Sequence, residues 1–62
     1  MPQPNEIVSA LVGRLTDHLR EIYEERAAIM EFDAGLPREY AEALALLALI
    51  QQYPSEVFAC WQ

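Results

Sequence analysis

The sequence contains no lysine, one cysteine, one histidine and only two glycines. A lone cysteine cannot form a disulfide within the chain, and one cysteine plus one histidine are too few for a structural zinc site, which takes four such ligands. Four basic residues, all arginines, accompany ten acidic ones, so the net charge at pH 7 is −6. Because phosphate binding needs clustered Lys and Arg, this balance argues against direct nucleic-acid binding, and it equally disfavours an anionic membrane surface.

Apolar residues are plentiful, but no run of them is long enough to cross a membrane. The longest, ALALLALI from Ala43 to Ile50, is far shorter than the roughly 20 residues that a spanning helix needs. The opening MPQPNE has neither the basic nor the apolar region of a signal peptide. We therefore expect a cytoplasmic protein without a membrane segment.

The length predicts a single domain of marginal stability, covering residues 1–62. A chain of this size buries only about 60% of the surface that its unfolded form exposes. Small domains without disulfides or metals gain further stability by associating with another chain. A hydrophobic content of 53% excludes a disordered acidic tail and favours such an associated, folded domain.

The first half of the chain has the spacing of an amphipathic helix. Residues 1–4 carry two prolines and should be extended, whereas Asn5 can accept a backbone N–H as the N-cap of a helix. From there to Phe32, apolar residues recur at intervals of three and four. The pattern predicts one helix over residues 5–32.

The segment DAGLPREY predicts a turn between two helices. Gly35 suits the left-handed position that closes a helix, with Leu36 folding back toward Met30. Pro37 suits the first turn of a second helix, predicted over residues 37–52. Tyr53-Pro54 should end it, followed by a short helix over residues 54–61. The expected fold is all-α: a helical hairpin with a short C-terminal helix.

The predicted helices have unequal lengths, and this mismatch predicts a homodimer. At about 1.5 Å per residue, the first helix would be roughly 42 Å long and the second roughly 24 Å. The second is also apolar on every side, as in a helix that is buried all round. We expect two copies to complete a helical bundle. The interface residues predicted on this basis are Val8, Val12, Leu15, Leu46, Leu49, Ile50, Phe58 and Trp61.

Two residues, Arg26 and Trp61, allow alternative interpretations. Arg26 is the one charged residue in the apolar seam of the first helix. Its guanidinium could reach solvent while its stem packs, or it could set the register of the assembly by pairing with Glu31 or Glu42. Trp61 could belong to the core or self-interface, or it could anchor a different protein.

No constellation of residues indicates catalysis or a cofactor. His18, Glu21 and Glu25 share a helix face, but the second helix offers too few ligands to complete a metal site. Asp17 or Cys60 beside His18 would lack a third, orienting group and an enclosed pocket. We expect a protein without enzymatic activity, metal or cofactor.

The segment ERAAIMEFDAGLPREYAEALAL, from Glu25 to Leu46, resembles a helix–turn–helix piece found in varied bacterial proteins of phages and other mobile elements. Those relatives carry Ser where this chain has Pro37, and often Glu where it has Tyr40, so their capping box is missing here. The resemblance covers about a third of the chain and implies an origin and a helical-hairpin shape. The piece has no agreed activity, so no site residues are carried over.

These observations predict a small acidic protein-interaction module that forms a homo-oligomer and binds another protein, with a basic partner favoured by the acidic surface. A mobile-element regulator or inhibitor is the expected role. The alternative is a nucleic-acid mimic, or a small nucleic-acid-associated regulator, whose acidic helices occupy a basic groove.

Overall fold

The computed structural model describes residues 3–62, apart from the side chain of Pro4, and this part of the chain is all-helical, as predicted. The four helices are α1 (Pro4–Val12), α2 (Asp17–Phe32), α3 (Arg38–Gln52) and α4 (Pro54–Cys60). Of the predicted extended segment 1–4, residues 1 and 2 lie outside the described residues. Gln3 is extended, with φ −74° and ψ 153°, and serves as the N-cap of α1.

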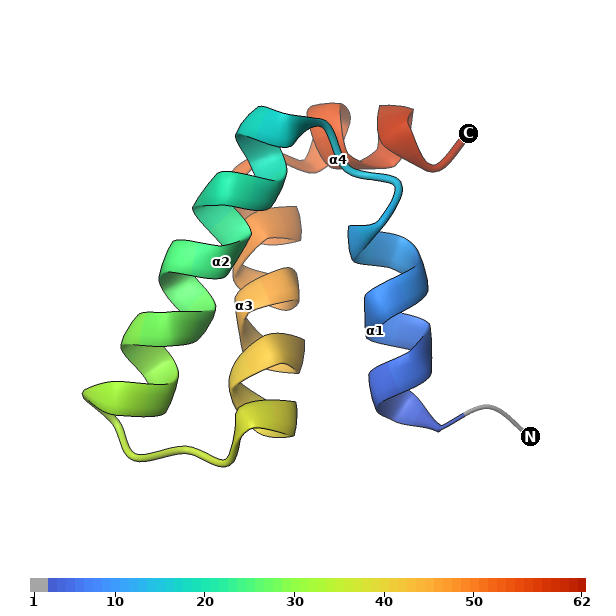
Figure 1. The fold of residues 1–62 in the computed structure, drawn as a ribbon. Coiled ribbons are helices and arrows are strands. Elements are labelled where there is room, and N and C mark those ends of the chain that lie inside the picture. The colour runs from blue at the N-terminus through green and yellow to red at the C-terminus, as the bar shows by residue number, and fades with distance from the viewer. Residues whose placement is uncertain (1–2) are drawn as a thin grey trace.

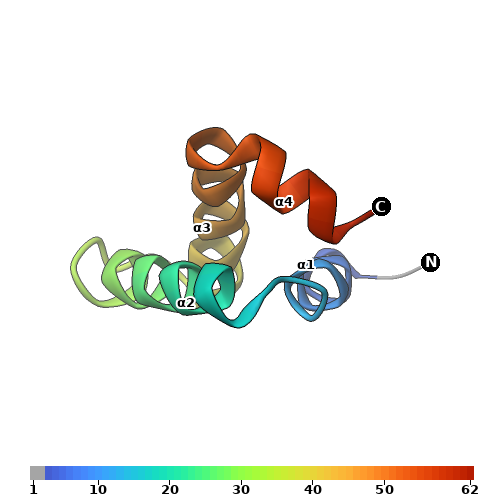
Figure 2. The same ribbon diagram turned by 90° about the horizontal axis from the view of Figure 1, so that it is seen from above.

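Helix α3 is the centre of the molecule. It makes its most extensive contact with α2 and also packs against α1 and α4. Figure 1 shows α2 and α1 on either side of α3, with α4 crossing the end of the bundle. Seen from above in Figure 2, α4 runs from the end of α3 toward the C-terminal end of α1.

The prediction of one helix over residues 5–32 is wrong, because the chain breaks between α1 and α2. Gly13 ends α1, and Thr16 begins α2 by accepting a hydrogen bond from the Leu19 backbone N–H at 3.3 Å. The apolar spacing conceals this break because Leu15, within it, is also buried. Asn5 is not the N-cap either, since α1 begins one residue earlier, at Pro4.

The later turns lie close to their predicted positions. Gly35 has a φ of +68°, and the Leu36 N–H donates to the Met30 carbonyl at 3.3 Å, which is the closing turn expected for α2. Pro37 is the N-cap of α3 rather than its first residue. Helix α4 ends at Cys60, one residue before the predicted end, with Trp61 as its C-cap.

The core lies where all four helices meet. Its buried members are Leu15, Leu19, Tyr23, Ala45, Leu46, Leu49 and Val57. Ala41 and Ala45 are completely buried, which indicates that small side chains on α3 allow its neighbours to approach closely. Because α1 folds back instead of extending α2, the length mismatch that predicted a homodimer is absent from the structure.

By length and composition, none of the described helices could cross a membrane alone. Helices α3 and α4 pass such a test only together, and they are bent by 114° where they meet.

Candidate interaction surfaces

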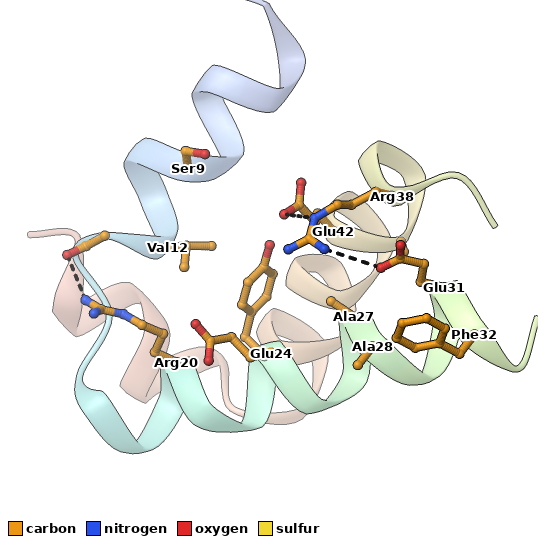
Figure 3. Close-up of a pocket in the computed structure, with 13 residues that line it drawn as sticks. Ser9, Val12, Arg20, Glu24, Ala27, Ala28, Glu31, Phe32, Arg38 and Glu42 are labelled. Carbon is orange, nitrogen blue, oxygen red and sulfur yellow. Dashed lines mark hydrogen bonds and ion pairs between the residues drawn. The ribbon is translucent and has the colours of Figure 1, made fainter. Parts of the chain in front are cut away.

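An open groove of about 520 Å³ lies between α1, α2 and α3, and we call it the central groove (Figure 3). Ser9, Val12 and Gly13 line it from α1 and its C-cap. Its polar and aromatic lining residues are Arg20, Tyr23, Glu24, Glu31, Phe32, Arg38 and Glu42. Alanines supply the rest of the lining, so the groove combines a short apolar wall with charged edges.

Arg38 bridges α2 and α3 at the edge of the groove. Its guanidinium lies 3.6 Å from a Glu31 carboxylate oxygen and 3.5 Å from a Glu42 carboxylate oxygen, and Figure 3 draws both pairs. The Arg38 side chain is 73% exposed, and exposed ion pairs contribute about 0–1 kcal/mol. This bridge is therefore weak and can rearrange at little cost.

Arg20 of α2 forms a hydrogen bond with the C-cap of α1. Its Nη2 donates a hydrogen bond to the Gly13 carbonyl at 3.3 Å, at the C-terminal end of α1. A cation is favoured there by the helix dipole and by the unpaired carbonyls of the last turn. The Nε atom of the same guanidinium is buried and has no hydrogen-bond partner among the described residues.

Tyr23 lies at the bottom of the central groove, and its side chain is among the most buried in the molecule. Among the described residues, no hydrogen bond is found for its hydroxyl. Burial raises the pKa of this phenol above the ordinary 10.0, the Glu42 and Glu24 carboxylates raise it further, and Arg38 partly offsets the effect. The Tyr23 side chain therefore stays protonated and neutral beside charged neighbours.

A second candidate surface is the outer face of α3, which we call the α3 face and define by Tyr40, Leu44, Leu47 and Gln51. These residues follow one another at intervals of four, three and four, so they form one stripe along the helix. Tyr40 is 65% exposed, Leu44 44% and Leu47 60%. The stripe contains no acidic or basic residue, whereas the chain as a whole has a net charge of −6.

The structure buries three of the eight predicted interface residues within the single chain, which corrects the prediction for those three. Leu15, Leu46 and Leu49 are core residues, so they are not available to a second chain. Val8, Val12, Ile50 and Trp61 are partly buried and pack against the core. Of the eight residues, Phe58 alone is exposed.

The sequence pattern missed the α3 face for a physical reason. A helix that is apolar on every side has no hydrophobic period that shows which side turns inward. Ala41 and Ala45 lie on the buried side, but Ala43 and Ala48 are equally small, so residue size does not distinguish the sides in the sequence. Packing against the other helices leaves Tyr40, Leu44 and Leu47 outside.

Arg26 has its partner in its own chain. Its guanidinium donates a hydrogen bond to the Gln52 side-chain oxygen at the end of α3. The carboxylates considered for it, Glu31 and Glu42, pair with Arg38 instead. A role for Arg26 in setting the register of an assembly stays a prediction.

Trp61, the C-cap of α4, contacts the last turn of α1. Its indole Nε1 donates a hydrogen bond to the Leu11 carbonyl of α1 at 3.0 Å, and its ring meets Phe58 edge to face at 5.9 Å. Trp61 is therefore half-buried against its own chain, Phe58 is the exposed aromatic of α4, and a role of Trp61 in anchoring a different protein stays a prediction.

The residues weighed for metal binding or catalysis form no metal-binding cluster within the described part of the chain. His18, Glu21 and Glu25 are exposed on α2, and Cys60 is a half-buried free thiol on α4. Within the described part of the chain, no three His, Cys, Asp or Glu side chains gather closely enough to hold a metal ion.

Comparison of the chain with protein-family models, with curated proteins and with solved structures found no significant match in any of the three.

Proposed function

We propose that the protein is a small, non-enzymatic protein-interaction module that associates with a second copy of itself through the α3 face. The observation that carries this proposal is the row of large exposed side chains, Tyr40, Leu44 and Leu47, on a protein whose other leucines are mostly packed inside. Fully burying such a side chain contributes about 1.5–3 kcal/mol. We further propose that it acts in the cytoplasm as a regulator or inhibitor from a mobile element; the sequence resemblance implies that origin but no activity.

The spacing of the α3 face makes it complementary to itself. The intervals of four, three and four read the same in both directions, as in the seam of a two-stranded coiled coil. If two copies pair antiparallel about a twofold axis, Leu44 lies opposite the partner's Leu47, and Tyr40 lies opposite the partner's Gln51. The second pairing would match a hydroxyl with an amide. On the flanks, Ala43 and Ala48 are small enough to permit a close approach.

Charge supports a second copy as the occupant of this face. Two molecules of charge −6 repel each other, and the α3 face is a surface where no ionisable acid would be brought into contact. Salt screens the repulsion between the acidic outer surfaces, with a Debye length of about 10 Å at 0.1 M. Self-association should therefore become stronger as salt is added.

The test is the mass of the protein in solution, measured by sedimentation equilibrium. The α3 face is short, so we expect a Kd of about 10 µM to 1 mM and a mass that rises with concentration from 7.1 kDa toward twice that value. Leu47→Glu should remain monomeric, because it places two carboxylates in the contact.

The matched control is Ile7→Glu, which adds the same charge at an exposed apolar position on α1. It should associate as the wild type does, apart from the small effect of one more charge. A wild-type mass of 7.1 kDa at about 1 mM, or equal loss of association in both variants, would contradict the proposal.

The alternative function, a nucleic-acid mimic or nucleic-acid-associated regulator, is favoured by a row of carboxylates on α2. Asp17, Glu21, Glu24 and Glu31 lie at helical intervals along one side of this helix. Such a row could occupy a basic groove in another protein. Binding of this kind should weaken steeply with added salt, which is opposite to the salt effect expected for self-association.

A further inference from the structure

We propose that the central groove binds an arginine side chain presented by a basic partner protein, with the Glu24 and Glu42 carboxylates and the Tyr23 hydroxyl as its acceptors. This inference rests on the proposed function only in taking the protein to be a binding module. It concerns a different surface, because no residue of the α3 face lines the groove.

The charges around the groove leave room for one more cation. Three glutamates and two arginines line it. Arg20 donates one hydrogen bond to the Gly13 carbonyl while its Nε has no partner among the described residues, and Arg38 is shared between Glu31 and Glu42 at the exposed edge. Glu24 has no ion pair among the described residues. A carboxylate without a counter-ion in a net acidic groove attracts a cation.

Tyr23 supplies an observation independent of the glutamates. This side chain is 5% exposed and lines the groove, and no hydrogen bond of its hydroxyl is found within residues 3–62. The ring is buried, whereas the phenol oxygen is not among the buried unpaired atoms and so stays accessible from the groove, where it can accept a hydrogen bond from a ligand group. A guanidinium there would donate to the phenol oxygen and to the neighbouring carboxylates at once.

The shape of the groove suits an arginine that remains part of a polypeptide. Its volume of about 520 Å³ lies within the range of ligand sites, and it is open along one side, so a side chain can enter while its backbone stays outside. Ala27, Ala28 and Ala41 provide an apolar wall for the methylene stem. Figure 3 shows Ala27 and Ala28 beside the Phe32 ring at the same edge of the groove.

Arginine is favoured over lysine by two features. A guanidinium can make paired hydrogen bonds with carboxylates in a plane, whereas an ammonium acts as a point charge. Phe32, which is 78% exposed, also offers an aromatic face on which a guanidinium can stack. Lysine should therefore bind more weakly at this site.

The test is an NMR titration of the full chain with the capped peptide acetyl-Gly-Arg-Gly-amide. We expect saturable shifts of the Tyr23, Glu24 and Glu42 amide signals, with a Kd of about 1–10 mM for so small a probe. The same peptide with citrulline in place of arginine keeps the shape and removes the charge, and it should cause no saturable shift. Glu24→Gln should weaken binding about threefold to tenfold.

The matched control is Glu21→Gln, which removes the same charge one turn away on α2, outside the groove. It should leave the affinity within about twofold of the wild type. Equal weakening in the two variants, or equal shifts with the citrulline peptide, would overturn the inference, because the attraction would then be general rather than local.

Failure of this inference and failure of the proposed self-association are distinguishable in the same samples. Leu47→Glu should bind the arginine peptide as the wild type does. A wild-type monomer that binds the peptide supports the groove and contradicts self-association, whereas a dimer that does not bind it contradicts the groove alone.

Discussion

Tyr23 illustrates how a single residue can serve both stability and a binding surface. Its ring belongs to the core with Leu19 and Leu49, while the same side chain lines the central groove beside Glu24 and Glu42. In the sequence, Tyr23 is one of the residues between Asn5 and Phe32, where apolar side chains recur at helical spacing. Its position beside the carboxylates depends on how α2 and α3 come together, which no local pattern encodes.

The raised pKa of Tyr23 predicts a specific loss of stability in alkali. Because the unfolded chain releases the phenol proton at a lower pH than the folded protein does, the free energy of unfolding falls as pH rises above about 10 and stops falling past the folded pKa. Below that window the contribution is fully present. Urea denaturation at several pH values measures this effect.

Tyr23→Phe is the matching control, since it removes the titrating group and keeps the ring. The variant should lose less stability than the wild type between about pH 9 and pH 11.5. At pH 7 the two proteins should differ by less than about 0.5 kcal/mol, because the hydroxyl has no partner within the described residues. Identical alkaline profiles would show that Tyr23 does not titrate differently on folding.

At the scale of helices, chain breaks were predictable where residues with special backbone preferences enforce them. Gly35 and Pro54 end helices as the sequence indicates, because one adopts a left-handed conformation and the other lacks an N–H. The break at residues 13–16 was missed, although Gly13 and Thr16 are suitable terminating and capping residues. The buried Leu15 continued the helical spacing across it.

Gly35 provides a direct test of the turn between α2 and α3. A Cβ added there would have no atom within 4 Å, so Gly35→Ala should destabilise the protein only through its left-handed backbone, by about 1–2 kcal/mol. Gly35→Asn should cost clearly less, because asparagine tolerates that conformation better. Thermal unfolding of both variants measures the difference. Equal losses in the two would indicate that backbone strain is not the cause.

At the scale of the whole molecule, α4 closes the fold by joining the end of α3 to α1. Val57 is completely buried in the core, and Trp61 reaches the Leu11 carbonyl. This arrangement covers apolar residues of α1 that the sequence assigned to a second chain. Of the predicted set of eight residues, Phe58 is left exposed, and the α3 face is exposed in the same chain.

Trp61→Phe should weaken the attachment of α4 to α1. The variant removes the indole N–H while keeping an aromatic ring, so we expect a loss of about 1 kcal/mol and a melting temperature about 4–8 °C lower. Hydrogen exchange should show the loss of protection mainly in the amides of α1. A uniform loss across all four helices, or no loss, would contradict this role of Trp61.

The sequence by itself determined that the chain is helical, where α2 turns into α3 and where α3 ends. These outcomes depend on helix propensity, a left-handed glycine and prolines, which act within a few residues. Only the tertiary structure decided which side of α3 turns inward, how α1 folds back and which charges gather around the groove. Those outcomes depend on contacts between segments distant in the chain, and an apolar helix offers several sides of nearly equal hydrophobicity from which packing selects one.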